Sequence, residues 1–160
     1  MKLRTCFAAA VSVALAAAAG AGVAQPRKIV PPAGTPAAAT HLNPNTATEA
    51  QLRAAGITAD VATAIARGKP YATQAALIKV VGPKVPAAQQ PAVYAAVFVP
   101  VGLNTATDEE IASIPGMTPR MIREFGEYRP YKDMTQFDRE IGKYVEEAEL
   151  KRLRSYVALK

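Results

Sequence analysis

The feature that most constrains this chain is an internal repeat. Asn45-Thr46-Ala47-Thr48 recurs as Asn104-Thr105-Ala106-Thr107, and after one additional residue in the second copy the offset settles at 60. Identical residues then continue in register: Gly56 with Gly116, Pro70-Tyr71 with Pro130-Tyr131, Gly82 with Gly142, Val85 with Val145 and Val97 with Val157. Such a pattern indicates a duplication. We therefore predict two copies of one small unit, over residues 42–101 and 102–160.

Each copy is predicted to form four short helices. Thr48-x-x-Gln51 and Thr107-x-x-Glu110 are capping boxes that open the first helix. Thr58 and Thr118 stand where the N-cap of a second helix is expected. Apolar residues indicate a third helix at 77–81 and 137–141, and a fourth over 93–98 and 150–159. No segment shows sustained alternation of apolar and polar residues together with an enrichment in β-branched side chains. The predicted fold class is therefore all-α, without a sheet.

The N-terminal residues 1–24 are typical of an export signal. Lys2 and Arg4 precede an Ala-rich apolar run, and Gly22-Val23-Ala24 places small residues before a cleavage site. We expect an exported, periplasmic or extracellular protein. An uncleaved membrane anchor is the alternative, although the run is short and weakly hydrophobic for a span. Residues 25–41 are rich in proline and alanine and predict an extended linker.

Charge is unevenly spread along the chain, whose formal net charge is +6. Two of the basic residues lie in the signal and two in the linker. The first unit has five basic and two acidic residues, whereas the second has ten basic and eleven acidic ones, or +3 and −1. The excess is therefore not one strong basic patch, and nucleic-acid binding has to be argued from local features.

The inventory of reactive side chains argues against an enzyme. Cys6 is the only cysteine and leaves with the signal if cleavage occurs, and His41 is the only histidine. No carboxylate pair or Gly-rich nucleotide loop occurs in a recognisable setting. We expect no catalytic residue, metal, cofactor or small-molecule substrate.

A hairpin-like segment in the second copy carries a family resemblance. Leu103-Asn104-Thr105-Ala106-Thr107 followed by Ile114-Pro115-Gly116-Met117-Thr118 resembles the helix-hairpin-helix family, and more narrowly its competence DNA-receptor (ComEA-like) type. The resemblance covers both units and implies tandem helix-hairpin-helix units that bind double-stranded DNA without sequence specificity, with a place in DNA uptake. Such units would hold phosphate through backbone amides at a helix N-terminus and through nearby basic side chains.

The resemblance also assigns candidate DNA-binding residues. The best set lies in the second copy: Gly116, Met117, Thr118, Arg120 and Arg123. Weaker members are Gly56, Thr58, Lys84 and Lys143. Both copies depart from the family pattern, because Thr58 and Thr118 replace a second glycine, and Asp60 stands where the second copy has Arg120. A Cβ at these threonines could crowd a phosphate, or the hydroxyl could cap the helix.

These departures leave an alternative function open. Degenerate units of this type are similar to the small extrinsic lumenal subunit (subunit U) of photosystem II, which uses the fold structurally. The alternative is therefore a periplasmic interaction or structural module, whose partner is an envelope protein rather than double-stranded DNA.

Overall fold

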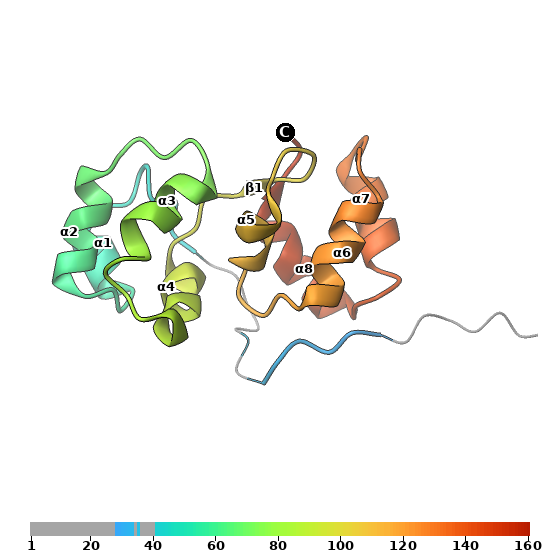
Figure 1. The fold of residues 1–160 in the computed structure, drawn as a ribbon, viewed down its shortest axis with the longest axis horizontal. Helices are drawn as coiled ribbons and strands as arrows, with labels where there is room; N and C mark the ends of the chain where they lie inside the picture. The colour runs from blue at the N-terminus through green and yellow to red at the C-terminus, as the bar shows by residue number, and fades with distance from the viewer. Residues whose placement is uncertain (1–27, 34, 36–40) are drawn as a thin grey trace, which may run out of the picture.

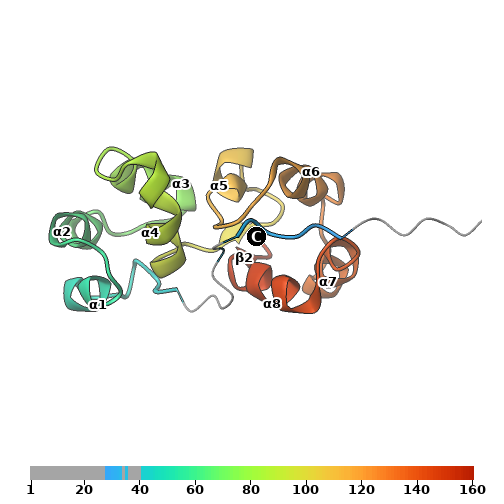
Figure 2. The same ribbon diagram turned by 90° about the horizontal axis from the view of Figure 1, so that it is seen from below.

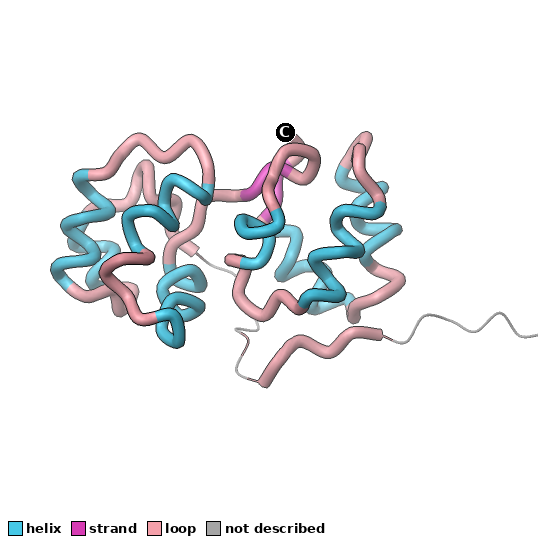
Figure 3. The backbone as a smooth tube through the Cα atoms, viewed as in Figure 1, coloured by secondary structure: helices cyan, strands magenta, loops and turns pink. Residues whose placement is uncertain are grey.

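The structure is a computed structural model, and it describes residues 28–33, 35 and 41–160. These residues are mostly helical and form two groups of short helices side by side (Figure 1; Figure 3). The expected export signal lies outside the described residues, as does much of the linker. No helix in the described ranges is long and apolar enough to cross a membrane.

Four α-helices lie in each group. The first group holds α1 (Glu49–Ala54), α2 (Ala59–Arg67), α3 (Gln74–Val81), the short 3-10 helix η1 (Ala87–Gln89) and α4 (Gln90–Ala96). The second holds α5 (Asp108–Ala112), α6 (Pro119–Glu127), α7 (Met134–Ile141) and α8 (Glu147–Ser155). Both predicted capping boxes are present, because Thr48 and Thr107 each exchange hydrogen bonds with the residue three positions on.

The prediction that the chain contains no sheet is wrong. Val101–Gly102 (β1) pairs in parallel with Val157–Ala158 (β2), and in the first group Leu42 forms the matching bridge with Val97. The fourth helices therefore end earlier than predicted, at Ala96 and Ser155. Two residues are too few to show the alternation that identifies a strand. Each short pairing joins the entry of a group to its exit.

The same pair of hydrogen bonds, which we call the asparagine bracket, holds the loop between the second and third helices of each group. The Asn45 side chain accepts a hydrogen bond from the Tyr71 N–H at 2.6 Å and donates one to the Tyr71 carbonyl at 2.9 Å. Asn104 makes the same two bonds with Tyr131, at 2.7 and 3.0 Å. The repeat in the sequence is thus also a repeat of individual contacts.

The two groups share one hydrophobic core that runs through both of them. Polar contacts add to it at the junction. The Glu110 carboxylate on α5 accepts a hydrogen bond from the Ala75 N–H on α3 at 3.0 Å. The fully buried Gln74 side chain accepts one from the Val99 N–H, also at 3.0 Å. A carboxylate beside the first turn of α3 also suits the helix dipole.

Candidate nucleic-acid interface

The two predicted hairpins have the same backbone geometry. Gly56 and Gly116 precede α2 and α6 with φ of +88° and +83°, and they are the only described residues with positive φ. Residues with a Cβ rarely adopt this conformation, which explains why glycine stands at both positions. Both turns therefore lie where the sequence predicts them, but the side chains that surround the two turns differ.

The first hairpin supplies its own anion. Thr58 lies at the N-cap of α2 but makes no side-chain capping bond; its hydroxyl instead donates to the Asp60 carboxylate at 2.6 Å. Hydrogen bonding, first from Thr58 and then from backbone N–H groups, lowers the pKa of Asp60. Lys84 also lowers it through its charge. A negative group thus lies at the helix N-terminus, where the candidate residues Gly56, Thr58 and Lys84 would have met a phosphate.

The second hairpin is capped differently. The Thr118 hydroxyl accepts a hydrogen bond from the Met121 N–H at 3.3 Å, as the capping interpretation predicts. Pro119 has no N–H to offer. Two of the first-turn positions of α6 therefore provide no free amide, and any anion bound here must depend more on side chains than on the backbone.

Two basic candidates from different parts of the second group come together over a pair of tyrosines. The Arg120 guanidinium lies 5.8 Å from the Tyr144 ring centroid, and the Lys143 ammonium lies 5.5 Å from that of Tyr128. The two tyrosine hydroxyls are 2.8 Å apart. This hydrogen bond, followed by burial, raises the pKa of Tyr144. We call these four residues the tyrosine–cation cluster.

Carboxylates lie beneath the cations of this cluster. Arg120 Nε is 3.7 Å from Glu124 Oε1, and the two side chains are 42% and 8% exposed. Lys143 and Arg139 both bind Glu140, whose side chain is 10% exposed. These hydrogen bonds lower the pKa of Glu140 and raise that of Lys143. The positive groups therefore face solvent, while their counterions are set back.

Arg123, one turn further along α6, is more loosely held. Its Nε is 3.9 Å from Glu127 Oε1, and both side chains are more than half exposed. Exposed pairs of this kind contribute about 0–1 kcal/mol, so Arg123 can exchange its partner for another anion at little cost.

The duplication itself is the signal that could have found the additional cluster residues. Tyr128, Tyr144, Glu124 and Glu140 were not predicted as site residues. At the 60-residue offset their counterparts are Gly68, Lys84, Ala64 and Val80. The first group folds without the cluster, so these side chains are not required by the fold.

An extended N-terminal segment lies across this part of the second group. We call residues 28–33 and 35 the covering segment. The Ile29 N–H donates to the Tyr144 carbonyl at 2.5 Å, and Lys28 Nζ donates to the Val145 carbonyl at 2.9 Å. At the other end Thr35 contacts the turn, since a Cβ on Gly116 would lie 2.5 Å from Thr35 Cγ2. In Figure 2 the segment crosses between α6 and the α7–α8 side.

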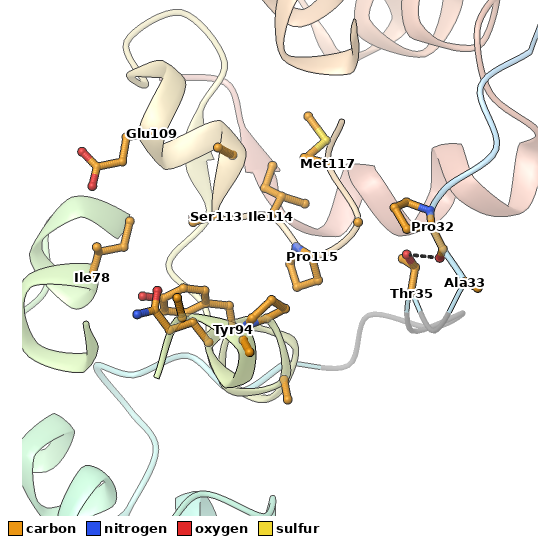
Figure 4. A pocket seen from close by; sticks show the side chains of 17 residues that line it. Pro32, Ala33, Thr35, Ile78, Tyr94, Glu109, Ser113, Ile114, Pro115 and Met117 are labelled. Carbon is orange, nitrogen blue, oxygen red and sulfur yellow. Dashed lines mark hydrogen bonds between the residues drawn. The ribbon is translucent and has the colours of Figure 1, made fainter. Parts of the chain in front are cut away.

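Beside the covering segment, a groove of about 690 Å³ opens between the two groups. Figure 4 shows Pro32, Ala33 and Thr35 on one side and Ile78, Glu109 and Tyr94 on the other. The candidates Gly116 and Met117 line it as well. Its lining is mostly small or apolar, so the basic candidates lie outside it.

His41, the only histidine, packs against aromatic rings. Its ring stacks on Tyr156 with centroids 4.6 Å apart and packs edge to face with Phe98, with centroids 5.7 Å apart. Burial lowers its pKa. Within residues 28–33, 35 and 41–160 there is no group of three or more metal-ligating side chains.

Comparison of the chain with family models, with curated proteins and with solved structures finds no match.

Proposed function

We propose that the chain is an exported binding protein, built from tandem helix-hairpin-helix units, whose second unit binds the sugar–phosphate backbone of double-stranded DNA without reading its sequence. The observation that carries the proposal is the tyrosine–cation cluster. It brings Arg120, from the first turn of α6, and Lys143, from the connection between α7 and α8, onto one face, and Arg123 extends that face by one turn of α6. Spaced positive charges on a rigid support suit the regular spacing of backbone phosphates.

The first unit acts as a scaffold in this proposal. Asp60 places negative charge at the N-terminus of α2, where a phosphate would otherwise bind, and no counterpart of the tyrosine pair is present. Its contribution is the shared core and the junction that fixes the second unit.

The test is fluorescence anisotropy with two unrelated duplex DNA sequences between 50 and 200 mM salt. Neutralising Arg120, Arg123 and Lys143 to Gln should weaken binding to both sequences alike. If each residue neutralises one phosphate, the slope of log K against log salt should fall in magnitude by about 2.7. A matched control neutralises two exposed bases of the first unit, Arg53 and Lys79, and should leave affinity nearly unchanged. Absence of binding at low salt, both by the parent chain and by a variant whose covering segment is detached, would refute the proposal.

A protein-interaction module is the second candidate. It is favoured by the covering segment, which shows that this face accepts an extended chain, and by the −1 charge of the second unit. Chemical cross-linking in intact cells followed by mass spectrometry distinguishes the two. A cross-link from the second unit to an envelope protein, together with no DNA binding, would favour this candidate.

Export is a separate part of the proposal and has its own measurement. The mass and N-terminal sequence of the protein recovered from the periplasm should correspond to a chain that begins at Gln25. Recovery of a chain that still starts at Met1, in the membrane fraction, would instead favour the anchor.

A further inference from the structure

The covering segment lies on the same surface that the proposed function needs. At one end, Thr35 contacts the turn at Gly116, and no atom of a ligand can occupy that space while Thr35 is there. At the other end, Ile29 and Lys28 bond to the main chain of Tyr144 and Val145, immediately after Lys143. The segment therefore reaches from the turn before α6, the helix that carries Arg120 and Arg123, to the connection between α7 and α8, which carries Lys143.

The contacts of the covering segment are few and shallow. Lys28 lies 3.5 Å from the Glu146 carboxylate, with side chains 46% and 75% exposed. Ile29 is only partly buried against the core, and Val30 is 81% exposed. Surface ion pairs contribute little, and segments with few buried contacts open at low cost. Such a segment can leave the surface while the helices beneath it remain folded.

We infer that the covering segment is an internal competitor of DNA: it occupies the hairpin face of the second unit in the free protein and is displaced when duplex DNA binds. This inference rests on the proposed function. The free energy of docking the segment then subtracts from that of DNA binding, so weakening the docked state must raise the apparent affinity.

The first experiment changes the anchor of the segment without changing charge. Ile29→Asn should bind duplex DNA about three to ten times more tightly than the parent chain, by anisotropy at fixed salt. Val30→Asn is the matched control, because the Val30 side chain is exposed and does not anchor the segment. This variant should bind DNA as tightly as the parent does. Equal affinity of the parent and Ile29→Asn would overturn the inference while leaving the proposed function in place.

Hydrogen exchange of the full chain provides a second measurement. In the free protein the Ile29 N–H is bonded to the Tyr144 carbonyl, so it should exchange more slowly than an unbonded amide, and this modest protection should be lost when DNA is added. Protection that persists in the DNA complex would overturn the inference. If neither the parent nor Ile29→Asn binds DNA, both the inference and the proposed function fail. Binding by Ile29→Asn alone would support both.

Discussion

At the scale of single residues, the hydrogen bonds of Asn45 and Asn104 explain why the Asn-Thr-Ala-Thr motif begins with asparagine in both units. The asparagine side chain supplies both the acceptor for the tyrosine N–H and the donor for the tyrosine carbonyl. No other side chain of that size offers both groups. Asn104 is half-buried, whereas Asn45 is exposed, so water can replace the lost bonds more easily in the first unit.

We predict that Asn104→Ala lowers the free energy of unfolding by about 2 kcal/mol, since two hydrogen bonds are lost and a half-buried N–H is left without its acceptor. Asn45→Ala, the equivalent change at an exposed position, should cost about half as much. Urea denaturation followed by circular dichroism measures both. Equal losses of unfolding free energy in the two variants would show that the exposure of the asparagine does not determine how much these hydrogen bonds contribute.

The stacked position of His41 predicts a pH dependence of stability. Burial lowers the pKa of this side chain below 6.5, so the folded state binds its proton less readily than the unfolded state does. The stabilisation is complete above pH 6.5 and is lost as the pH falls from there through the folded pKa.

Accordingly, the melting temperature should fall between pH 7.5 and pH 5 in the parent chain, and less so in His41→Phe, which keeps an aromatic ring but cannot titrate. Differential scanning calorimetry at several pH values measures the difference. Parallel curves for the two proteins would assign the acid sensitivity to other groups.

At the scale of helices, the two units differ in how their second helix begins. Thr118 caps α6 through the Met121 N–H, whereas Thr58 directs its hydroxyl to Asp60. The same residue type at the same repeat position therefore does two different jobs, because the residue two positions later is Arg in one copy and Asp in the other.

From this contrast we predict that Thr118→Ala destabilises the protein by about 1 kcal/mol, the usual value of a lost N-cap, and that Thr58→Ala costs only a few tenths. Thermal unfolding of the two variants at one pH provides the comparison. A larger loss for Thr58→Ala would mean that its bond to Asp60 supports α2 as effectively as a cap does.

Helix order and the capping boxes could be predicted from the sequence because their determinants are local. Thr48 and Gln51 contact each other within one turn, and the apolar spacing of each helix is visible in a short window. The ends of α4 and α8 could not be predicted, because the residues that follow them pair with Leu42 and Val101, more than fifty positions away. The same limit applies to the site, where Tyr128 and Tyr144 meet only in the folded chain.

At the scale of the whole molecule, Glu110 couples the two units. Its carboxylate completes the capping box with Thr107 and also accepts the Ala75 N–H from the other unit. Among the described residues, its counterpart in the first unit, Gln51, forms side-chain hydrogen bonds only with its cap residue, Thr48. Comparing substitutions of Glu110 and Gln51 therefore separates the contribution of the junction to stability from that of the helix cap.

Glu110→Ala should therefore cost about 2 kcal/mol more than Gln51→Ala, because it leaves an additional N–H of the other unit without its acceptor. Urea unfolding, followed by circular dichroism and by tyrosine fluorescence, measures both values. We also expect a single transition in the parent chain, as one shared core implies. Two separated transitions in the parent would contradict this view of the junction.

The short strand pairs have a mechanical consequence. In the second unit the chain enters along β1 and leaves along β2, which run in the same direction side by side. Tension applied to the two ends would pull these strands past each other along their length, so that the hydrogen bonds between them share the load rather than opening one after another. The helices between the strands would carry none of that tension until the pair had slipped. A pull transmitted through the chain, from a tether or from a bound polymer, would thus meet its resistance at a pairing of only two residues.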